Sequence, residues 1–333
     1  MSRAHAPSSR EARTAASTSA NTTFSRRAWL SLAAAPLMAC AAPPPLVLFV
    51  HAGDAAATAN AETLAAIREV LAARQLQFEV KQLPIGAGPA ADVEAAAQLA
   101  QEITERNPNL VMVWGDDVMS RLVAPYLRGG PIPVVYGGVQ WAATPYGVPN
   151  HFVTGIVETP PVQDTILLAK TKKPEAKDLF VLAGDTPDIR RNRVYLDPVY
   201  WRNKLSTTYG LVSNFESWKK AFRWANNNNK AELIFLVSNR GIADWDEEAA
   251  KQHITEHLRI PVFTCDAQLM PYAVVGRVND RREQGEWMGQ QAQLILDGTS
   301  PGEIRGAQTK RSQVLHNAAL AEKIGFVLPE QKG

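Results

Sequence analysis

The sequence contains very little cysteine, with only Cys40 and Cys265 among its 333 residues. If Cys40 is lipidated, as argued below, no disulfide bond can form within the chain, and the fold must depend on its hydrophobic core. The chain after the N-terminal region also lacks any apolar run near the ~18 residues that a transmembrane helix needs. About 290 residues are enough for two lobes of ordinary size.

The sequence also has little excess charge of either sign, with 35 Lys and Arg residues against 33 Asp and Glu residues. Residues 1–39 contain five of the arginines and one of the glutamates, so 30 basic and 32 acidic residues remain from Cys40 onward. A protein that binds nucleic acid neutralises phosphates with a basic face. The near-neutral body therefore argues against nucleic acid as a partner.

The first 39 residues predict an export signal. Arg26 and Arg27 directly precede the apolar run 28–39, which is too short to cross a bilayer as a stable helix. The long polar leader, the arginine pair and the modest hydrophobicity resemble a twin-arginine (Tat) signal, with Trp29 where that pattern usually has Phe. An ordinary Sec signal with a basic start is the alternative.

Residues 37–40, Leu-Met-Ala-Cys, resemble a lipobox, in which the thiol of Cys40 is acylated and anchors the mature protein to a membrane. We expect this outcome, and residues 40–45 then form a short stiff tether rich in proline. The alternative is ordinary cleavage after Ala41, which would remove Cys40.

From Leu46 onward, short β-branched runs alternate with helical patterns, which predicts an α/β protein with parallel sheets. A first series has expected strands at 46–50, 78–83, 110–114, 133–137 and 153–157, and expected helices at 55–74, 91–106 and 117–127. A second series has expected strands at 179–183, 210–214, 233–238 and 261–265, and expected helices at 193–205, 215–226 and 246–258. A strand and a helix (282–296) within 272–301 indicate that the chain crosses back between two lobes. Two lobes joined in this way predict a cleft that binds a ligand.

Several segments resemble a known family. They are IPVVYGGV at 132–139, IPVFTCDAQLMPYAVVG at 260–276, EQGEWMGQQAQLILDGTSPGEI at 283–304 and VLHNAALAEKIGFVLP at 314–329. They are similar to the ABC-transporter substrate-binding family, to which TrpX-like amino-acid binders belong. The resemblance implies a type I periplasmic-binding fold, with two Rossmann-like lobes with parallel sheets joined by a three-strand hinge. We assign 46–157 plus 279–304 to the first lobe and 158–278 plus 305–330 to the second. The Asp-Pro pair that the family usually has near Gln140 and Trp141 is missing here, which puts the ligand class of better-known members in doubt.

Ligands of parallel α/β sheets bind beyond the carboxyl ends of the strands, where loops and helix N-termini present N–H groups. This rule selects the candidate ligand-binding residues. In the first lobe they are His51, Asp54, Trp114, Asp116, Tyr136, Gln140 and Trp141. In the second lobe they are Asp185, Asn239, Arg240 and Asp266.

The chemistry of these residues suggests their roles. Trp114 and Trp141 would offer aromatic faces to an aromatic or cationic ligand, although each could instead pack beneath a loop. The guanidinium of Arg240 could bind a carboxylate. An amine could be received by one of the aspartates, with N-capping of the next helix as the alternative role for each: Asp116, Asp185 and Asp266.

One motif points to a different class of protein. His253, Glu256 and His257 match H-x-x-E-H, an inverted zinc-protease motif that places two imidazoles on one helical face. The helix that carries them lies between two expected strands, far from the strand ends that define the cleft. We therefore interpret it as a solvated helix face and keep a zinc-dependent hydrolase as a remote alternative. Cys265 has no histidine near it at the cleft except His51, so a catalytic thiol is not expected.

The sequence as a whole predicts an extracytoplasmic solute-binding protein of the periplasm or cell envelope, without enzymatic activity or cofactor. Its ligand would be a small organic molecule, such as an aromatic or other amino acid or a small carboxylate, delivered to an ABC permease. Ligand contacts from both lobes would stabilise a closed form. A ligand-sensing module for a membrane signalling protein is the alternative.

Overall fold

A computed structural model of the protein describes residues 43–53, 58–227 and 231–328. The predicted export signal, Cys40 and Asp54 lie outside these ranges. The fold described below belongs to a single unit that begins at Pro44. None of the helices in the described ranges has the length and apolar character needed to cross a membrane.

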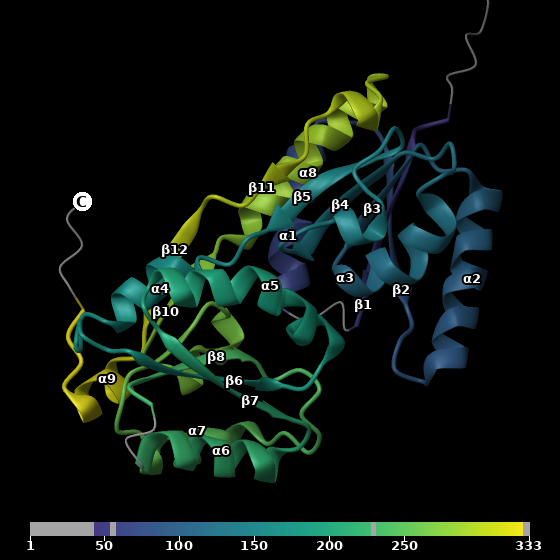
Figure 1. Ribbon diagram of the computed structural model, residues 1–333. Helices are drawn as coiled ribbons and strands as arrows, with labels where there is room; N and C mark the ends of the chain where they lie inside the picture. Colours follow the sequence, from purple (N-terminus) through teal and green to yellow (C-terminus); the bar gives the residue numbers. More distant parts are fainter. Residues whose placement is uncertain (1–42, 54–57, 228–230, 329–333) are drawn as a thin grey trace, which may run out of the picture. The chain divides into compact units, whose positions relative to one another are not determined.

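The first lobe is built on a six-stranded sheet in the order β11-β5-β4-β3-β1-β2, and every neighbouring pair is parallel. Its strands are β1 (Leu46–Ala52), β2 (Gln77–Leu83), β3 (Leu110–Trp114), β4 (Val134–Gln140), β5 (Val153–Glu158) and β11 (Ala307–Gln308). Its helices are α1 (Thr58–Leu71), α2 (Pro89–Arg106), α3 (Asp116–Val118), a π-helix (Met119–Leu127), a 3₁₀ turn (Thr144–Tyr146) and α8 (Arg281–Leu296). Figure 1 shows α2 on one side of this sheet and α1 and α8 on the other.

Alternating side chains of β1 explain why both faces of the first sheet are covered. Leu48 and Val50 pack with α2 and the π-helix, whereas Val47 and Phe49 pack with residues of α1 and α8. Successive side chains of a strand point to opposite faces, so an entirely apolar strand must be buried on both sides.

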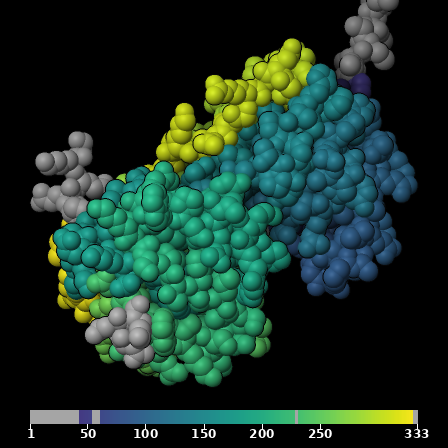
Figure 2. Space-filling view, viewed as in Figure 1, coloured from purple at the N-terminus to yellow at the C-terminus, as the bar shows by residue number. Residues whose placement is uncertain are grey.

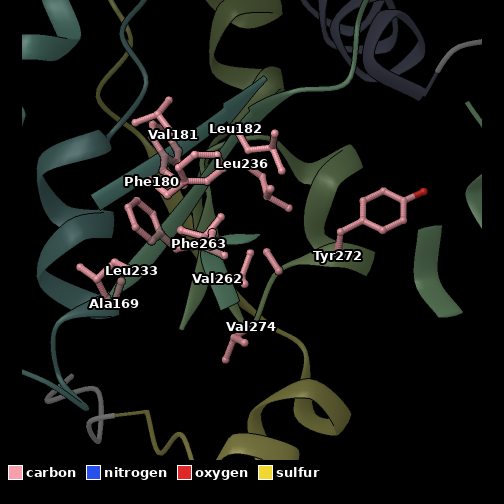
Figure 3. Packing of buried hydrophobic residues seen from close by; sticks show 14 of the residues in the cluster. Ala169, Phe180, Val181, Leu182, Leu233, Leu236, Val262, Phe263, Tyr272 and Val274 are labelled. Carbon is pink, nitrogen blue, oxygen red and sulfur yellow. The ribbon is translucent and has the colours of Figure 1, made fainter. Parts of the chain in front are cut away.

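The second lobe repeats the same plan, with a sheet in the order β12-β10-β9-β8-β6-β7 and only β12 antiparallel to its neighbour. Its strands are β6 (Asp178–Gly184), β7 (Ser206–Val212), β8 (Leu233–Ser238), β9 (Val262–Thr264), β10 (Val275–Asn279) and β12 (Ser312–His316). Its helices are α4 (Val162–Ala169), α5 (Pro187–Arg202), α6 (Phe215–Asn227), α7 (Glu247–His257) and α9 (Ala318–Ile324), with a 3₁₀ turn at Ala267–Tyr272. A further 3₁₀ turn, Pro301–Glu303, belongs to the first lobe, where the N–H of Gly302 donates to the carbonyl of His151 at 3.0 Å. Figure 3 shows side chains from β6, β8 and β9, including Phe180 and Phe263, gathered in the core of the second lobe.

The chain passes between the lobes three times, from β5 to α4, from β10 to α8 and from β11 to β12. These connections are hydrogen-bonded to one another. The N–H of Thr309 donates to the carbonyl of Val157 at 3.0 Å, and the N–H of Asp280 donates to the carbonyl of Arg311 at 3.0 Å. The side-chain amide of Asn279 donates to the carbonyl of Thr159 at 3.1 Å. The three connections therefore form one continuous hinge.

The fold predicted from sequence is present, with local differences. The strand expected at 210–214 is β7, which begins at Ser206, and the helix expected from 193 is α5, which begins at Pro187. Proline fits the first turn of a helix because its missing N–H would have no partner there. Strand β11 lies in the first sheet although residues 305–330 were assigned to the second lobe, and the predicted lobe boundaries as a whole remain a proposal.

Candidate ligand-binding site between the lobes

A cavity of about 110 Å³ lies between the two lobes, where the carboxyl ends of β4, β5, β8 and β9 meet. Figure 2 shows the surface hollowed where the blue and green parts of the chain face each other. The polar and charged residues that line the cavity are Gln140, Glu158, Asp188, Asn192, Ser238, Arg240, Cys265, Asp266 and Arg281. The remaining lining residues are Trp141, Pro160, Val162, Ile189, Leu196, Phe235 and Val237.

The loop after β4 brings Trp141 into this cavity through an unusual turn. Trp141 has φ 65°, and the N–H of Ala142 donates to the carbonyl of Gln140 at 2.8 Å, which closes a three-residue turn. Positive φ is costly for a bulky residue and persists only where the surroundings impose it. Here the N–H of Trp141 donates to the carbonyl of Glu158 at 2.9 Å, and the N–H of Gln140 donates to the carboxylate of Asp116 at 3.1 Å.

The same loop touches helix α5 of the second lobe. The indole of Trp141 stacks on the ring of Tyr195, with centroids 5.6 Å apart and planes 4° from parallel. The side-chain amide of Asn192 donates to Oε1 of Gln140 at 3.2 Å. Two contacts of different kinds thus join the lobes beside the cavity.

Charged residues add further contacts between the lobes. The guanidinium of Arg240 lies 3.2 Å from the carboxylate of Asp117 and 3.9 Å from that of Asp188. Arg191 lies 3.6 Å from Asp116. Because Arg240 is largely exposed, we expect its ion pair to contribute on the order of 1 kcal/mol at most.

Asp116 holds the loop that contains Gln140 and Trp141. Burial raises the pKa of its carboxyl, although the hydroxyl of Tyr146, the N–H of Gln140 and the charge of Arg191 counteract this effect. The hydroxyl of Tyr146 donates to the carboxylate of Asp116. Asp116 is therefore a partner of the Gln140–Trp141 loop, and it is absent from the described lining of the cavity.

The part of the cavity nearest the hinge contains two carboxyl groups and a thiol. Burial raises the pKa of Glu158, the charge of Asp266 raises it further, and the charge of Arg281 lowers it. Burial also raises the pKa of Cys265 to about 12, so its thiol is neutral near pH 7. The sulfur of Cys265 lies 3.3 Å from Oγ1 of Thr165, within hydrogen-bonding distance.

The structure brings four of the predicted site residues together: Gln140, Trp141, Arg240 and Asp266 line the cavity. Asp266 has the capping role as well, since its carboxylate accepts the N–H of Gln268 at 2.9 Å. Asp185 forms a two-point ion pair with Arg190, at 2.7 and 2.6 Å.

The other predicted residues lie elsewhere among the described residues. Trp114 packs over Gly137 and Gly138, where a Cβ added at either glycine would lie within 3.0 Å of the indole. The side chains of His51 and Tyr136 are buried, and the carbonyl of Asn239 accepts the N–H of Ile242 at 3.2 Å. None of these four residues is among the lining residues.

Four lining residues that sequence reasoning did not select are Glu158, Asp188, Asn192 and Arg281. Glu158 is the last residue of β5, so the strand-end rule could have identified it. Asp188 and Asn192 are one helical turn apart at the start of α5, which places them on the same face.

The H-x-x-E-H motif lies on α7, and its first histidine is used in packing. Nε2 of His253 donates to the carbonyl of Lys219 at 3.1 Å, and its ring stacks on that of His257 with centroids 4.3 Å apart. Burial lowers the pKa of His253. Within the described part of the chain, no three His, Cys, Asp or Glu side chains are grouped so that they could hold a metal ion. The zinc-hydrolase alternative therefore gains no support from this geometry.

Comparison with known families agrees with this architecture. The model of the family described as ABC transporter substrate binding protein matches residues 58–332. The chain belongs to this family. Members of the family bind small-molecule substrates outside the cytoplasm and work with ABC permeases. Among curated proteins, none matches the sequence.

Solved structures related to this family member share its type I periplasmic-binding fold. A conserved domain protein from Vibrio cholerae is 19% identical, with a TM-score of 0.67, and the match covers 86% of this chain and 97% of that one. The ABC domain from Streptococcus pneumonia in complex with L-Trp is 14% identical, with a TM-score of 0.63 and coverage of 86% and 96%. The ligand-free, open structure of a substrate-binding protein with adhesive properties from Clostridium difficile is 13% identical, with a TM-score of 0.68 and coverage of 86% and 97%.

Proposed function

We propose that the protein captures a small organic solute in the cavity between its lobes and delivers it to an ABC importer. The observation that carries this proposal is the cavity itself, which is lined from both lobes at the carboxyl ends of their strands. Apolar residues such as Trp141 and Phe235 line the cavity together with polar groups such as Gln140 and Asn192, as in sites that bind molecules with an apolar and a polar part. An amino acid or small carboxylate fits this description, and the Streptococcus relative holds L-Trp.

Binding would work by closure of the lobes around the hinge. Contacts from both lobes to one ligand stabilise the closed form, in addition to the contacts that the lobes already make across the cleft. These contacts include the Trp141–Tyr195 stack and the Arg240–Asp117 pair. We propose no catalytic step, since the thiol of Cys265 is neutral and far less reactive than a thiolate.

We also propose that the mature protein is held at the membrane of the periplasm or cell envelope by lipid on Cys40, after export by a Tat-like signal. The support is the sequence at 26–27 and 37–40. Replacing Cys40 with alanine should move the protein from the membrane fraction to the soluble extracytoplasmic fraction. If the distribution of the Cys40→Ala variant equals that of the wild type, lipidation at this residue is wrong.

Native mass spectrometry of the purified protein with a panel of amino acids and small carboxylates tests the binding function. We expect one bound molecule per chain, and we expect Trp141→Ala to weaken its binding by about tenfold or more, because the indole forms part of the cavity wall. Trp201→Ala is the matched control, since Trp201 is 78% exposed on the outer surface of α5. Equal losses of affinity in both variants, or no bound molecule from any class in the panel, would argue against the proposal.

A further inference from the structure

The charges that line the cavity do not balance. Three carboxylates, those of Glu158, Asp188 and Asp266, face two guanidinium groups, those of Arg240 and Arg281. The lining therefore has one more negative than positive group when all five are ionised. A ligand with one positive charge would neutralise it, whereas an anionic ligand would increase the imbalance.

The pairing distances increase this negative character. Asp188 has Arg240 at 3.9 Å and Asp266 has Arg281 at 3.8 Å, whereas charge-assisted hydrogen bonds in proteins are about 2.7–2.9 Å long. Arg240 lies closest to Asp117, which is absent from the described lining. Among the described residues, Glu158 has no ion-pair partner, and its side chain interacts with two neutral amides, that of Asn279 at 3.5 Å and that of Gln284. All three carboxylates thus retain acceptor capacity for a ligand.

An uncharged acceptor points to the same kind of ligand. Asn192 lines the cavity and is only 3% exposed, and its amide nitrogen is occupied by Gln140. Its Oδ1 is buried without a hydrogen-bond partner in the described structure. A buried carbonyl oxygen without a donor costs about 1–3 kcal/mol, so a donor on the ligand would be favoured there.

The size of the cavity limits the ligand. A water molecule needs roughly 10–15 Å³ of such a volume, so about 110 Å³ accommodates roughly 7 to 11 non-hydrogen atoms. The apolar wall, which includes Val162, Ile189 and Leu196, suits a short hydrocarbon or aromatic chain. The space is therefore appropriate for a small molecule with one polar head and one apolar tail.

We propose that the ligand has a protonated primary amine, which binds the carboxylate of Glu158 and the amide oxygen of Asn192, with its apolar part against Trp141 and its neighbours. The inference rests on the proposed binding function and deepens it, because it names the chemical group that is recognised. Burial raises the pKa of Glu158, and a bound ammonium group would offset the cost of keeping that carboxyl charged. The amine could belong to an amino acid or to a simple amine, since both present the same ammonium group.

Two matched sets of probes separate these chemistries. One set is leucine, isoamylamine and isocaproate, and the other is phenylalanine, phenethylamine and hydrocinnamate. Within each set the apolar tail is the same. The first compound has both an ammonium group and a carboxylate, the second has the ammonium group alone, and the third has the carboxylate alone. Isothermal titration calorimetry with the wild-type protein should show binding of at least one probe that has an ammonium group and no detectable binding of isocaproate or hydrocinnamate. If the simple amine binds with an affinity similar to that of the amino acid, the protein does not recognise the carboxylate of the amino acid.

Variants test whether the preference for an ammonium group arises from residues of the cavity. Glu158→Gln keeps the shape of the side chain and should weaken binding of the ammonium probe by about 30-fold or more, because a buried charge pair is lost. Asn192→Asp should strengthen binding, because it adds a second carboxylate. Glu105→Gln, on the exposed face of α2, is the matched control and should not change the affinity. Thermal unfolding of each variant shows whether it is folded.

The outcomes distinguish failure of the inference from failure of the function. If isocaproate or hydrocinnamate binds and no ammonium probe does, the binding function stands and the assigned charge preference is wrong. If Glu158→Gln binds the ammonium probe as tightly as the wild type, Glu158 is not its partner. If no probe of either set binds the wild-type protein, the inference fails, and the broader panel used for the proposed function then decides whether the protein binds any other solute.

Discussion

The stacked pair of Trp141 and Tyr195 allows a quantitative test of how the lobes are held together. The stack joins the loop after β4 to helix α5, with ring centroids 5.6 Å apart. An aromatic pair contributes about 0.5–1.5 kcal/mol beyond the burial of its surface. Removing it with Tyr195→Ala should therefore increase the ratio of the open to the closed form roughly 2- to 13-fold, because each 1.4 kcal/mol corresponds to a factor of ten.

The thiol of Cys265 can report this opening. It lines the cavity, and with Cys40 replaced by serine it is the only thiol in the chain. Burial raises its pKa to about 12, so thiolate is scarce while the lobes are closed. The rate of labelling by a thiol reagent should then follow the open population, and Tyr195→Ala should accelerate labelling by roughly 2- to 13-fold.

The matched control is Tyr126→Ala. Tyr126 is 42% exposed on the π-helix of the first lobe, so its removal should not change the labelling rate. Equal rates in the wild type and in Tyr195→Ala, with both folded, would refute the idea that the stack holds the lobes together. Equal acceleration in both tyrosine variants would show that labelling follows general loss of stability.

Three further predictions concern stability. Trp114→Ala should lower the free energy of unfolding, measured by urea denaturation, by about 3 kcal/mol, because Trp114 packs over Gly137. It should have little effect on ligand affinity. A large loss of affinity in a stable variant would contradict this prediction. Burial lowers the pKa of His253 from 6.5, so the folded protein binds fewer protons at this residue than the unfolded chain does. The stability of the folded protein should therefore fall as the pH drops below about 6.5. Thermal unfolding of His253→Gln should show a smaller decline over the same pH range. A Cβ at Gly184 would lie 1.8 Å from the carbonyl oxygen of Arg240, so Gly184→Ala should lower the free energy of unfolding by about 1–3 kcal/mol. An unchanged melting temperature in thermal unfolding would show that the loop containing Arg240 moves to make room for the new methyl group.

The central strands were predictable because their residues are apolar without interruption. Leu110–Trp114 and Leu233–Ser238 were predicted with the bounds of β3 and β8, since strands buried on both faces show continuous apolar runs. The edge strand β7 was misplaced because its first residues, Ser206 to Tyr209, are mostly polar and only partly buried. Strand β11 has two residues, and only its position beside β5 makes it a strand.

The site was predictable where it depends on strand ends. Gln140 ends β4, Trp141 follows it, and Arg240 and Asp266 lie two residues beyond β8 and β9, so the strand-end rule selects residues that line the cavity. Asn192 lies inside a helix, and the face of α5 that meets the cavity is determined by packing between the lobes. Trp114 also ends a strand, but the glycines of β4 leave room for its ring against the sheet, and sequence spacing did not reveal this.

The first lobe is assembled from segments that are far apart in the chain, and this has a consequence for synthesis. Helix α8 covers the face of the first sheet that carries Phe49 and Met112, yet it is made only after most of the second lobe. A Cβ at Gly285 of α8 would lie 2.4 Å from the carbonyl oxygen of Thr63 in α1, so the two helices pack closely and a segment with a larger residue at this position could not take the place of α8. A nascent chain that ends near residue 158 therefore lacks the cover that α8 gives to its part of this apolar sheet face. The two lobes must mature together, and the ligand site exists only once the whole body of the chain has been made.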